Sequence, residues 1–286
     1  MWKNQSFIVR CLPDALYLQM KFKKRMGQHL NLRYPKTFNQ KIQWLKLHDR
    51  KPEYTEMVDK VQAKEIVRQI LGDDYLIPTL GVWKRAEDID FSSLPERFVL
   101  KCTHDSGSVF ICNDRKQFDQ EKTVRKLSDS LNGNFYYVGR EWPYKNVIPR
   151  VLAEPYIVDH ESGSLDDYKF FCFHGKADCV MVCTERKTGT PKFYFFDRNW
   201  NLLRINVRGK EAPENFTLPK PARMDEMFEI AERLSSGIPF VRVDLYNCNE
   251  QIYFGEWTFY PDSGFDKNLL PETDLYFGDK INLMEV

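Results

Sequence analysis

The 286-residue sequence lacks several motifs that identify common enzyme classes. It contains no GxSxG sequence, which a hydrolase nucleophile elbow requires, and none of its five histidines belongs to an HExxH zinc site. The phosphate loop GxxxxGKS/T and the dinucleotide-binding sequence GxGxxG are also absent. No apolar run approaches the length of a membrane-spanning helix, and no signal-peptide segment begins the chain. We therefore expect a cytoplasmic protein.

Disulfide and zinc patterns are lacking among the seven cysteines. Their number is odd, no two have CxxC spacing, and five lie in apolar strand-like runs, which predicts reduced, buried thiols. A large net charge is lacking too: the formal value of +1 argues against nucleic acid as the main partner. Residues 1–52 nevertheless carry twelve Lys and Arg against two Asp. This basic segment leaves open a contact with an anionic glycan or with the inner membrane surface.

Apolar residues make up 42% of the chain and aromatic residues 14%, which is enough for a sizeable core. Hydrophobic spacing predicts helices over about 13–27, 40–47, 54–70, 119–131 and 224–234. Strands are predicted over 75–80, 82–83, 98–102, 109–112, 152–158, 168–173, 177–185, 192–197, 240–246 and 251–259. Helices come first and a strand-rich body with intervening helices follows, so the predicted fold class is α+β.

The stretch from residue 240 to residue 264 predicts a hairpin that carries charges in apolar strands. Arg242, Asp244 and Glu256 are costly to bury unless they pair with each other or hold a cation. Two interpretations stay open from these residues alone. One is a structural salt bridge; the other is a magnesium site that faces a phosphate, with the arginine on a developing oxyanion.

The register of this hairpin follows from the second interpretation. A shared magnesium ion requires Asp244 and Glu256 to lie opposite each other on one face of the sheet. This pairing predicts that Arg242 faces Thr258, Tyr246 faces Phe254 and Cys248 faces Ile252. The connection must then hold an odd number of residues, such as Asn249-Glu250-Gln251, unless a bulge restores the parity. Asn249 is the expected left-handed residue.

Three further features could carry chemistry. Lys101 is the one charge in an apolar strand and precedes the polar loop 103–108, an arrangement that can hold phosphates, although a lysine beside an ordinary turn is equally common. Lys169 interrupts an aromatic strand, where an outward-pointing side chain is an equal alternative. Asp88-Ile89-Asp90 fits the DxD pattern by which many glycosyltransferases hold a metal and a nucleotide sugar, but three residues match often by chance.

Together these segments resemble the ATP-grasp superfamily, and more closely its TupA-like branch from teichuronopeptide and other surface-polysaccharide biosynthesis. The resemblance rests on YPKTFNQKIQW (34–44), VDK (58–60), YLIP (75–78), FVLKCTHDSG (98–107), RVDLY (242–246) and GEWTFYPDSG (255–264). It implies an ATP-grasp fold with a helical N-terminal subdomain (1–95) and two strand-rich subdomains that enclose the nucleotide. These are a lid subdomain with the lysine, loop and hinge (96–165) and a metal-binding subdomain (166–286).

The resemblance also implies roles for individual residues. Those implied to bind ATP are Lys101, Asp105, Ser106, Gly107, Ser108, Glu154, Tyr156, Ile157, Asp167 and Lys169. Among them, Lys101 would contact the phosphates beneath the loop 105–108, and Glu154, Tyr156 and Ile157 would form the hinge that receives adenine. Asp167 would bind the ribose, and Lys169 would be a second nucleotide contact. Asp244 and Glu256 match the magnesium-binding carboxylates, and Thr258 stands where other members have a metal-binding asparagine. Arg242 matches the catalytic arginine that binds the substrate carboxylate or acyl phosphate.

By this resemblance, the expected activity is that of an ATP- and magnesium-dependent carboxylate–amine ligase that forms an acyl phosphate. It would act in cell-surface polysaccharide (capsule) biosynthesis, amidating an acidic sugar. Phosphoryl transfer requires chiefly positioning and charge neutralisation, which agrees with the lack of a catalytic His or Cys constellation. Two alternatives stay open: a glycosyltransferase that uses Asp88 and Asp90, and a non-catalytic nucleotide-binding protein of the same pathway.

Overall fold

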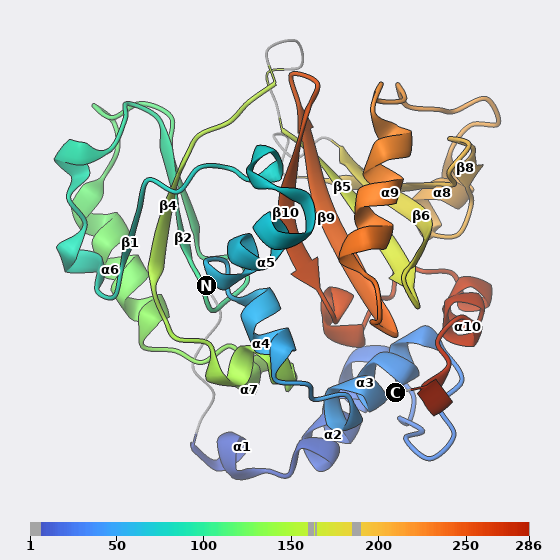
Figure 1. Cartoon of the computed structure of the whole chain (residues 1–286). Helices are drawn as coiled ribbons and strands as arrows, with labels where there is room; N and C mark the ends of the chain where they lie inside the picture. Colours follow the sequence, from blue (N-terminus) through green and yellow to red (C-terminus); the bar gives the residue numbers. More distant parts are fainter. Residues whose placement is uncertain (1–6, 160–162, 164, 185–189, 286) are drawn as a thin grey trace. The chain divides into compact units, whose positions relative to one another are not determined.

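The computed structural model describes residues 7–159, 163, 165–184 and 190–285 (Figure 1). The chain divides into two compact units, each of which combines segments that are distant in sequence. The first unit consists of Met1–Pro13 and Arg50–Val158, and the second of Asp14–Asp49 and Asp159–Val286. The helices predicted near the N-terminus are therefore distributed over both units. The predicted subdomain boundaries at 95/96 and 165/166 stay predictions.

The first unit is built on a four-stranded antiparallel sheet with the strand order β1-β4-β2-β3. Its strands are β1 (Gly81–Trp83), β2 (Phe98–Cys102), β3 (Val109–Cys112) and β4 (Val151–Pro155). Its helices are α1 (Phe7–Cys11), α4 (Glu53–Val58), α5 (Gln62–Leu71), α6 (Gln120–Leu131) and α7 (Tyr136–Gly139), and four short 3-10 helices occur between them. Leu127 of α6 is buried in one apolar cluster with Phe98 and Leu100 of β2, so α6 covers this sheet.

Two predictions for the first unit are wrong. The helix predicted over 54–70 is interrupted between α4 and α5, where the buried Asp59 carboxylate accepts a hydrogen bond from the backbone N–H of Val61 at 3.0 Å. Such a side-chain bond competes with the helical bonding pattern. The strand predicted over 75–80 is also absent. Residues Asp73–Tyr75 form a 3-10 helix instead, and pairing with β4 begins only at Gly81.

The second unit is built on a six-stranded antiparallel sheet with the order β10-β9-β5-β6-β7-β8. Its strands are β5 (Asp166–Phe173), β6 (Lys176–Thr184), β7 (Lys192–Phe196), β8 (Leu202–Leu203), β9 (Phe240–Cys248) and β10 (Gln251–Thr258). Its helices are α2 (Asp14–Met26), α3 (Phe38–His48), α8 (Val207–Glu211), α9 (Met224–Leu234) and α10 (Pro271–Asp279), with 3-10 helices η6 (Pro261–Gly264) and η7 (Leu283–Glu285). Residue 185, the last of one predicted strand, lies outside the described residues.

Helices cover both faces of this sheet. On one face, Phe228 of α9 contacts Phe170 of β5 with ring centroids 5.0 Å apart. On the other face, Phe38 of α3 lies 4.8 Å from Phe240 of β9 and 5.8 Å from Phe277 of α10. The prediction that apolar residues of the basic segment 1–52 pack on the strand-rich body is thus confirmed for α3. The first six residues of that segment lie outside the described residues, and those up to Pro13 belong to the first unit. Both sheets with their helices confirm the predicted α+β class.

The β9–β10 hairpin confirms the pairing that matters most. Asp244 is opposite Glu256, and Arg242 is opposite Thr258. The connection, however, is a two-residue turn and not the predicted three-residue one. Its residues Asn249 and Glu250 both have left-handed backbones (φ 51° and 62°), as a tight hairpin turn requires, so the expectation for Asn249 is confirmed.

A bulge at Gly255 reconciles the short turn with the correct pairing. The register shifts by one residue between Phe254 and Glu256, so Tyr246 pairs with Tyr253 and not with Phe254. Cys248 likewise pairs with Gln251 and not with Ile252. A Cβ atom at position 255 would lie 3.0 Å from the carbonyl oxygen of Asp244, so the close approach of the strands favours glycine here.

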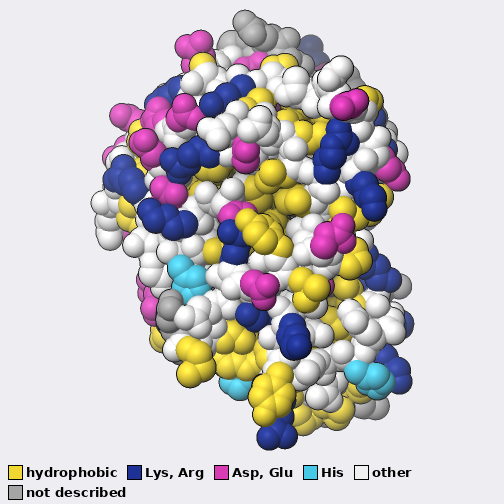
Figure 2. Space-filling model, turned by 90° about the vertical axis from the view of Figure 1, so that its right-hand side faces the viewer, with side chains coloured by type: hydrophobic (Ala, Val, Ile, Leu, Met, Phe, Trp, Pro, Cys, Tyr) yellow, Lys and Arg dark blue, Asp and Glu magenta, His cyan; other side chains and the backbone are white. Residues whose placement is uncertain are grey.

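The remaining general features agree with the composition. All seven cysteines are free thiols, and all except Cys11 are buried. None of the helices in the described ranges is both long and apolar enough to cross a membrane. On the face drawn in Figure 2, positive and negative side chains are interspersed with hydrophobic ones, as a net charge near zero leads one to expect.

Candidate functional site

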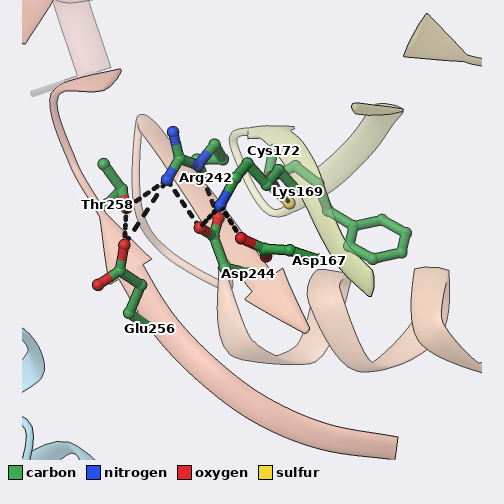
Figure 3. A network of polar contacts seen from close by, with 8 residues as sticks. Asp167, Lys169, Cys172, Arg242, Asp244, Glu256 and Thr258 are labelled. Carbon is green, nitrogen blue, oxygen red and sulfur yellow. Dashed lines mark hydrogen bonds and ion pairs between the residues drawn. The ribbon is translucent and has the colours of Figure 1, made fainter. Parts of the chain in front are cut away.

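A row of charged side chains crosses three neighbouring strands of the second unit. Lys169 of β5 is opposite Asp244 of β9, which is opposite Glu256 of β10. Successive side chains of a strand point to opposite faces, so Arg242 lies on the same face as Asp244, two positions away. We call these residues, with Asp167 and Thr258, the Asp244 cluster; Figure 3 shows that they point toward one another.

Asp244 lies at the centre of the cluster. The Arg242 guanidinium donates two hydrogen bonds to it, from Nε to Oδ1 at 2.6 Å and from Nη2 to Oδ2 at 2.7 Å. Lys169 Nζ also donates to Asp244 Oδ2 and lies 2.5 Å from Asp167 Oδ2. Both oxygens of Asp244 are therefore engaged by cations, and the predicted salt bridge is present.

Glu256 is held much more loosely. Its Oε1 lies 3.7 Å from Arg242 Nη2 and accepts a hydrogen bond of 3.3 Å from the hydroxyl of Thr258. That hydroxyl in turn accepts a hydrogen bond of 3.0 Å from Arg242. The Glu256 side chain is 41% exposed, whereas that of Asp244 is 2% exposed. Glu256 is thus the carboxylate of the cluster with the most freedom to bind an additional group.

The protonation states follow from this geometry. Burial acts to raise the pKa of Asp244, but Arg242 and Lys169 outweigh it and hold that pKa below its usual value. Burial likewise acts to lower the pKa of Arg242, and Asp244 reverses the shift and raises it. Asp244 is therefore ionised and Arg242 protonated at neutral pH, and each stabilises the charge of the other.

The donor set of the cluster fits magnesium, which the resemblance implies. Magnesium prefers oxygen ligands and is usually held by one or two carboxylates together with substrate phosphates and water. Asp244 and Glu256 provide two carboxylates on one face, and the Thr258 hydroxyl adjoins them. Within the described ranges no group of three or more His, Cys, Asp or Glu is placed to hold a metal by itself. A bound magnesium ion would thus depend on ligands from the substrate.

A second charged cluster lies in the first unit. Lys101 Nζ of β2 is 2.6 Å from Glu154 Oε2 of β4, and Lys64 of α5 bonds the other carboxylate oxygen. We call these three residues the Glu154 cluster. Burial acts to raise the pKa of Glu154, but the two lysines lower it; burial lowers the pKa of Lys64 in spite of its attraction to Glu154. Sequence reasoning did not identify Lys64, because its helix carries other charges and no spacing links it to β4.

The loop after Lys101 is mostly a buried framework. Ser108 Oγ donates to the carboxylate of Asp105 and lies 3.0 Å from the hydroxyl of Ser130 in α6. Lys60 Nζ donates to the carbonyl oxygen of Asp105 at 2.5 Å. Asp105 and Ser108 are both buried, whereas Ser106 and Gly107 are exposed. Gly107 has φ 101°, which a side-chain-bearing residue rarely adopts. The exposed tip of this loop is therefore the part that can approach a ligand.

The other residues predicted to bind the nucleotide differ in whether their polar groups already have partners within the protein. The backbone N–H of Tyr156 donates to the carbonyl of Arg97 at 3.3 Å, and Ile157 follows directly after it. Asp167 is buried and pairs with Lys169, which occupies the carboxylate expected to meet a ribose. The structure brings Asp167, Lys169, Arg242, Asp244, Glu256 and Thr258 together, and separately Lys101 and Glu154. The nucleotide roles of these residues stay predictions.

The DxD pair has local structural partners. Asp88 forms an exposed ion pair of 2.7 Å with Arg85. Asp90 caps a 3-10 helix by accepting a hydrogen bond from the backbone N–H of Ser92 at 2.9 Å. Each carboxylate is thus explained by its immediate neighbours, and no observation links the two to a shared cation.

Comparison with known proteins identifies one family. The model of the family described as TupA-like ATPgrasp matches residues 40–282. No curated protein matches the sequence. Similar solved structures include the ATP-grasp ligase PsnB with a minimal precursor (TM-score 0.45, 10% identity) and the D-alanine–D-alanine ligase from Helicobacter pylori (0.46, 15%). The L-amino acid ligase from Bacillus licheniformis is another (0.44, 16%).

These structural likenesses are remote. The PsnB comparison covers 84% of this chain and 65% of PsnB, and the Helicobacter pylori comparison covers 85% and 68%. The Bacillus licheniformis comparison covers 79% of this chain and 49% of that ligase. This chain thus spans less than two thirds of the length of PsnB. The family model carries the assignment, and the likenesses add no argument about individual residues.

Proposed function

This chain belongs to the TupA-like ATP-grasp family, and on that premise we propose that it is an ATP- and magnesium-dependent ligase that joins a carboxylate to an amine. The observation that carries the proposal is the register of the β9–β10 hairpin. It sets Asp244 opposite Glu256 and brings Arg242 to both on the same face. Two carboxylates and an arginine in this arrangement suit a phosphoryl-transfer site, which needs charge neutralisation more than a protein nucleophile.

The proposed reaction has two steps. In the first, a carboxylate oxygen of the acid attacks the γ-phosphorus of ATP, forming an acyl phosphate and releasing ADP. In the second, the amine nitrogen attacks the acyl carbon, the phosphate leaves, and the nitrogen loses a proton to give the amide. Arg242 orients the acid and neutralises charge on the acyl phosphate, since its Nη2 already reaches toward the more exposed Glu256 edge of the cluster. Asp244 and Glu256 would hold magnesium, which would supply Lewis-acid stabilisation to the transferring phosphoryl group.

The Glu154 cluster has a complementary role in this proposal. Two lysines share one carboxylate, so the cluster retains a net positive charge that suits the phosphates of ATP. Lys101 is held by its ion pair with Glu154, and the backbone N–H groups of the exposed residues Ser106 and Gly107 would add hydrogen bonds to a phosphate oxygen. Tyr156 and Ile157 would present their remaining backbone groups to adenine, as the family resemblance implies.

The acid substrate is proposed to be an acidic sugar of a cell-surface polysaccharide, amidated in the cytoplasm. Support comes from the resemblance to the branch that serves such pathways. A peripheral contact with the inner membrane surface through α2 fits this setting. Leu16 and Met20 are exposed one helical turn apart, and Lys23 follows on the exposed side.

Release of ADP tests the proposal. Purified protein with Mg-ATP, a uronic acid and an amine should release ADP only when the acid is present, and Asp244→Asn should abolish this release. Asp88→Asn is the matched control, because a glycosyltransferase that used the DxD pair would lose activity there. Tight binding of a UDP-sugar without binding of Mg-ATP in isothermal titration would contradict the ligase proposal. ATP binding with no ADP release for any acid and amine would favour a non-catalytic role.

A further inference from the structure

Lys60 lies in the first unit at the junction between α4 and α5, and its side chain is half-buried. Its ammonium donates a hydrogen bond to the carbonyl oxygen of Asp105 at 2.5 Å, and its backbone N–H donates to the carbonyl oxygen of Thr103 at 3.3 Å. Within the part of the chain that the structure describes, the side chain forms no other hydrogen bond and no ion pair. The charge of Lys60 is therefore directed at a backbone atom of the loop 103–108.

The neighbouring residue Asp59 fixes the position from which Lys60 reaches the loop. Asp59 is fully buried, and its carboxylate accepts a hydrogen bond of 2.6 Å from Arg150 Nη2. The carbonyl oxygen of Arg150 accepts a hydrogen bond of 2.9 Å from the backbone N–H of Thr103, the first residue of the loop. The α4–α5 junction and the start of the loop are thus joined to the same segment, which holds Lys60 and its acceptor in place.

The carbonyl and N–H groups of the loop differ in where they find partners. The carbonyl oxygen of Asp105 accepts its hydrogen bond from Lys60. That of Gly107 accepts a hydrogen bond of 3.0 Å from the N–H of Val109. In contrast, the backbone N–H groups of Ser106 and Gly107 donate to no acceptor among the described residues. Both residues are exposed, so these N–H groups are open to a ligand.

The planarity of the peptide bond connects Lys60 to one of these N–H groups. The carbonyl oxygen of Asp105 and the N–H of Ser106 belong to the same trans peptide unit, so they point in opposite directions. Because Lys60 holds the carbonyl oxygen from the side of the α4–α5 junction, the N–H of Ser106 points away from that junction, at the exposed tip of the loop. The positive charge also polarises this peptide unit, which makes the N–H a stronger donor to an anion.

His104 is a second residue of the loop that could carry a positive charge. It is buried, and its Nε2 lies 3.0 Å from the carbonyl oxygen of Ser130 in α6. Burial lowers the pKa of His104, although the negative charge of Asp105 acts to raise it. His104 is therefore neutral at neutral pH, and the ammonium of Lys60 supplies the positive charge at the Asp105 carbonyl.

We propose that Lys60 is a positioning residue for ATP, which holds the loop 103–108 in the conformation that presents the Ser106 N–H to a phosphate oxygen. The inference deepens the proposed function and rests on the binding of ATP at this loop. Lys60 acts through the peptide unit between Asp105 and Ser106 and does not itself contact the nucleotide. Its effect should be confined to the phosphates, because adenosine carries no anionic group for the loop to bind.

Isothermal titration of the full chain with Mg-ATP and with adenosine tests this proposal. Lys60→Met removes the hydrogen bond to Asp105, and it should weaken Mg-ATP binding about tenfold while leaving adenosine binding unchanged. Lys60→Arg retains a cationic donor and should restore most of the affinity for Mg-ATP. Unchanged Mg-ATP affinity in Lys60→Met would overturn the inference, and so would an equal loss for both ligands, which indicates a purely structural role.

Lys41 provides a matched control in the second unit. Its Nζ donates to the carbonyl oxygen of Ile281 at 2.8 Å, so Lys41→Met removes a bond of the same kind at a distant place in the chain. This variant should leave the affinities for both ligands unchanged. Equal losses of Mg-ATP affinity in Lys41→Met and Lys60→Met would indicate a general effect of removing a lysine and would contradict the inference.

A double-mutant cycle tests whether Lys60 acts through the peptide unit. Ser106→Pro removes the N–H that Lys60 is proposed to orient, and no hydrogen bond within the described residues is lost with it. Unchanged adenosine binding shows that this variant is folded. The losses of Mg-ATP affinity in Lys60→Met and Ser106→Pro should not add in the double variant, because both remove the same contact. Losses that multiply would show that Lys60 contacts the nucleotide independently and would overturn the proposal.

The same measurements separate this inference from the ligase proposal. If the wild-type chain and Lys60→Met bind Mg-ATP equally well, the inference fails and the proposed function stands. If the variants behave as predicted but no acid and amine give release of ADP, Lys60 keeps its positioning role and the ligase proposal fails.

Discussion

The Glu154 cluster of the first unit and the Asp244 cluster of the second both hold several charged side chains around a buried carboxylate, but the net charges of the two clusters have opposite signs. In the first, two lysines share one carboxylate, so one positive charge is left over. In the second, two cations meet Asp167, Asp244 and Glu256, so one negative charge is left over. An excess of positive charge attracts phosphate, and an excess of negative charge attracts a metal cation.

The clusters also differ in how far their lysine side chains are exposed to water. Lys101 is 21% exposed and can lose its partner to water, whereas Lys169 is 10% exposed and lies between two carboxylates. Breaking a buried pair leaves an uncompensated charge in a poorly solvated place, which costs more than breaking an accessible one. Substitutions in the second unit should therefore affect stability and function together, and those in the first chiefly function.

The largest expected effect is that of Asp244→Asn. Removing its charge leaves Arg242 without its bidentate partner, so we expect a loss of about 3–5 kcal/mol in the free energy of unfolding and loss of ADP release. Glu256→Gln is the matched control: it should also abolish ADP release but change stability by less than about 1 kcal/mol, because its side chain is exposed. Urea unfolding measures the stability of both variants. Equal stabilities of the two variants would contradict the distinction between Asp244 as a structural carboxylate and Glu256 as a carboxylate that only binds a ligand.

The next largest effect compares the two lysines. Lys169→Met leaves Asp167 uncompensated and should cost about 2–3 kcal/mol of stability, whereas Lys101→Met leaves Glu154 paired with Lys64 and should cost about 1 kcal/mol. Both should weaken ATP binding by about 1.5–3 kcal/mol if each contacts a phosphate. Calorimetric titration with ATP checks this, and unchanged nucleotide affinity in both variants would retire the phosphate-contact role.

A smaller effect concerns pH. Arg242 and Lys169 lower the pKa of Asp244, whereas burial and Asp262 raise that of Asp266 to about 6. A raised carboxyl pKa means that the folded state binds the proton more tightly than the unfolded state, so this group lowers stability as pH rises from about 4 to 6. Asp266→Asn should therefore stabilise the protein by about 2 kcal/mol at pH 8 and by nothing below pH 4. Thermal unfolding of both proteins between pH 4 and pH 8 measures this difference in stability, and a difference that does not depend on pH would contradict the prediction.

The smallest effect is expected at the bulge. Gly255→Ala places a Cβ atom 3.0 Å from the Asp244 carbonyl and 3.1 Å from the Tyr246 ring, so the strands must separate slightly, at about 1 kcal/mol. The same movement should shift Glu256 relative to Asp244 and raise the magnesium concentration needed for half-maximal ADP release. A variant with wild-type magnesium dependence would indicate that the alignment of the two carboxylates is not critical.

Much of the local structure could be predicted because it depends on neighbouring residues. Helix α9 begins and ends where its apolar spacing predicts, and Thr37 caps α3 by accepting a hydrogen bond from the N–H of Gln40. The facing of Asp244 and Glu256, which the magnesium interpretation requires, is confirmed, whereas the partners predicted for Tyr246 and Cys248 from strand alternation are shifted by one residue at the bulge. The match of the family model confirms the family that the motifs predict.

The sequence by itself determined the fold class and the family, because periodicity, caps and motifs are encoded by residues close together in the chain. Only the tertiary structure decided that Lys64 shares Glu154 with Lys101, that a two-residue turn is offset by the Gly255 bulge, and that Lys60 reaches the carbonyl of Asp105. These features depend on contacts between residues far apart in sequence, where several geometries suit the same local pattern. Packing selects one of them because burying a charge without a partner costs more than a local preference can offset.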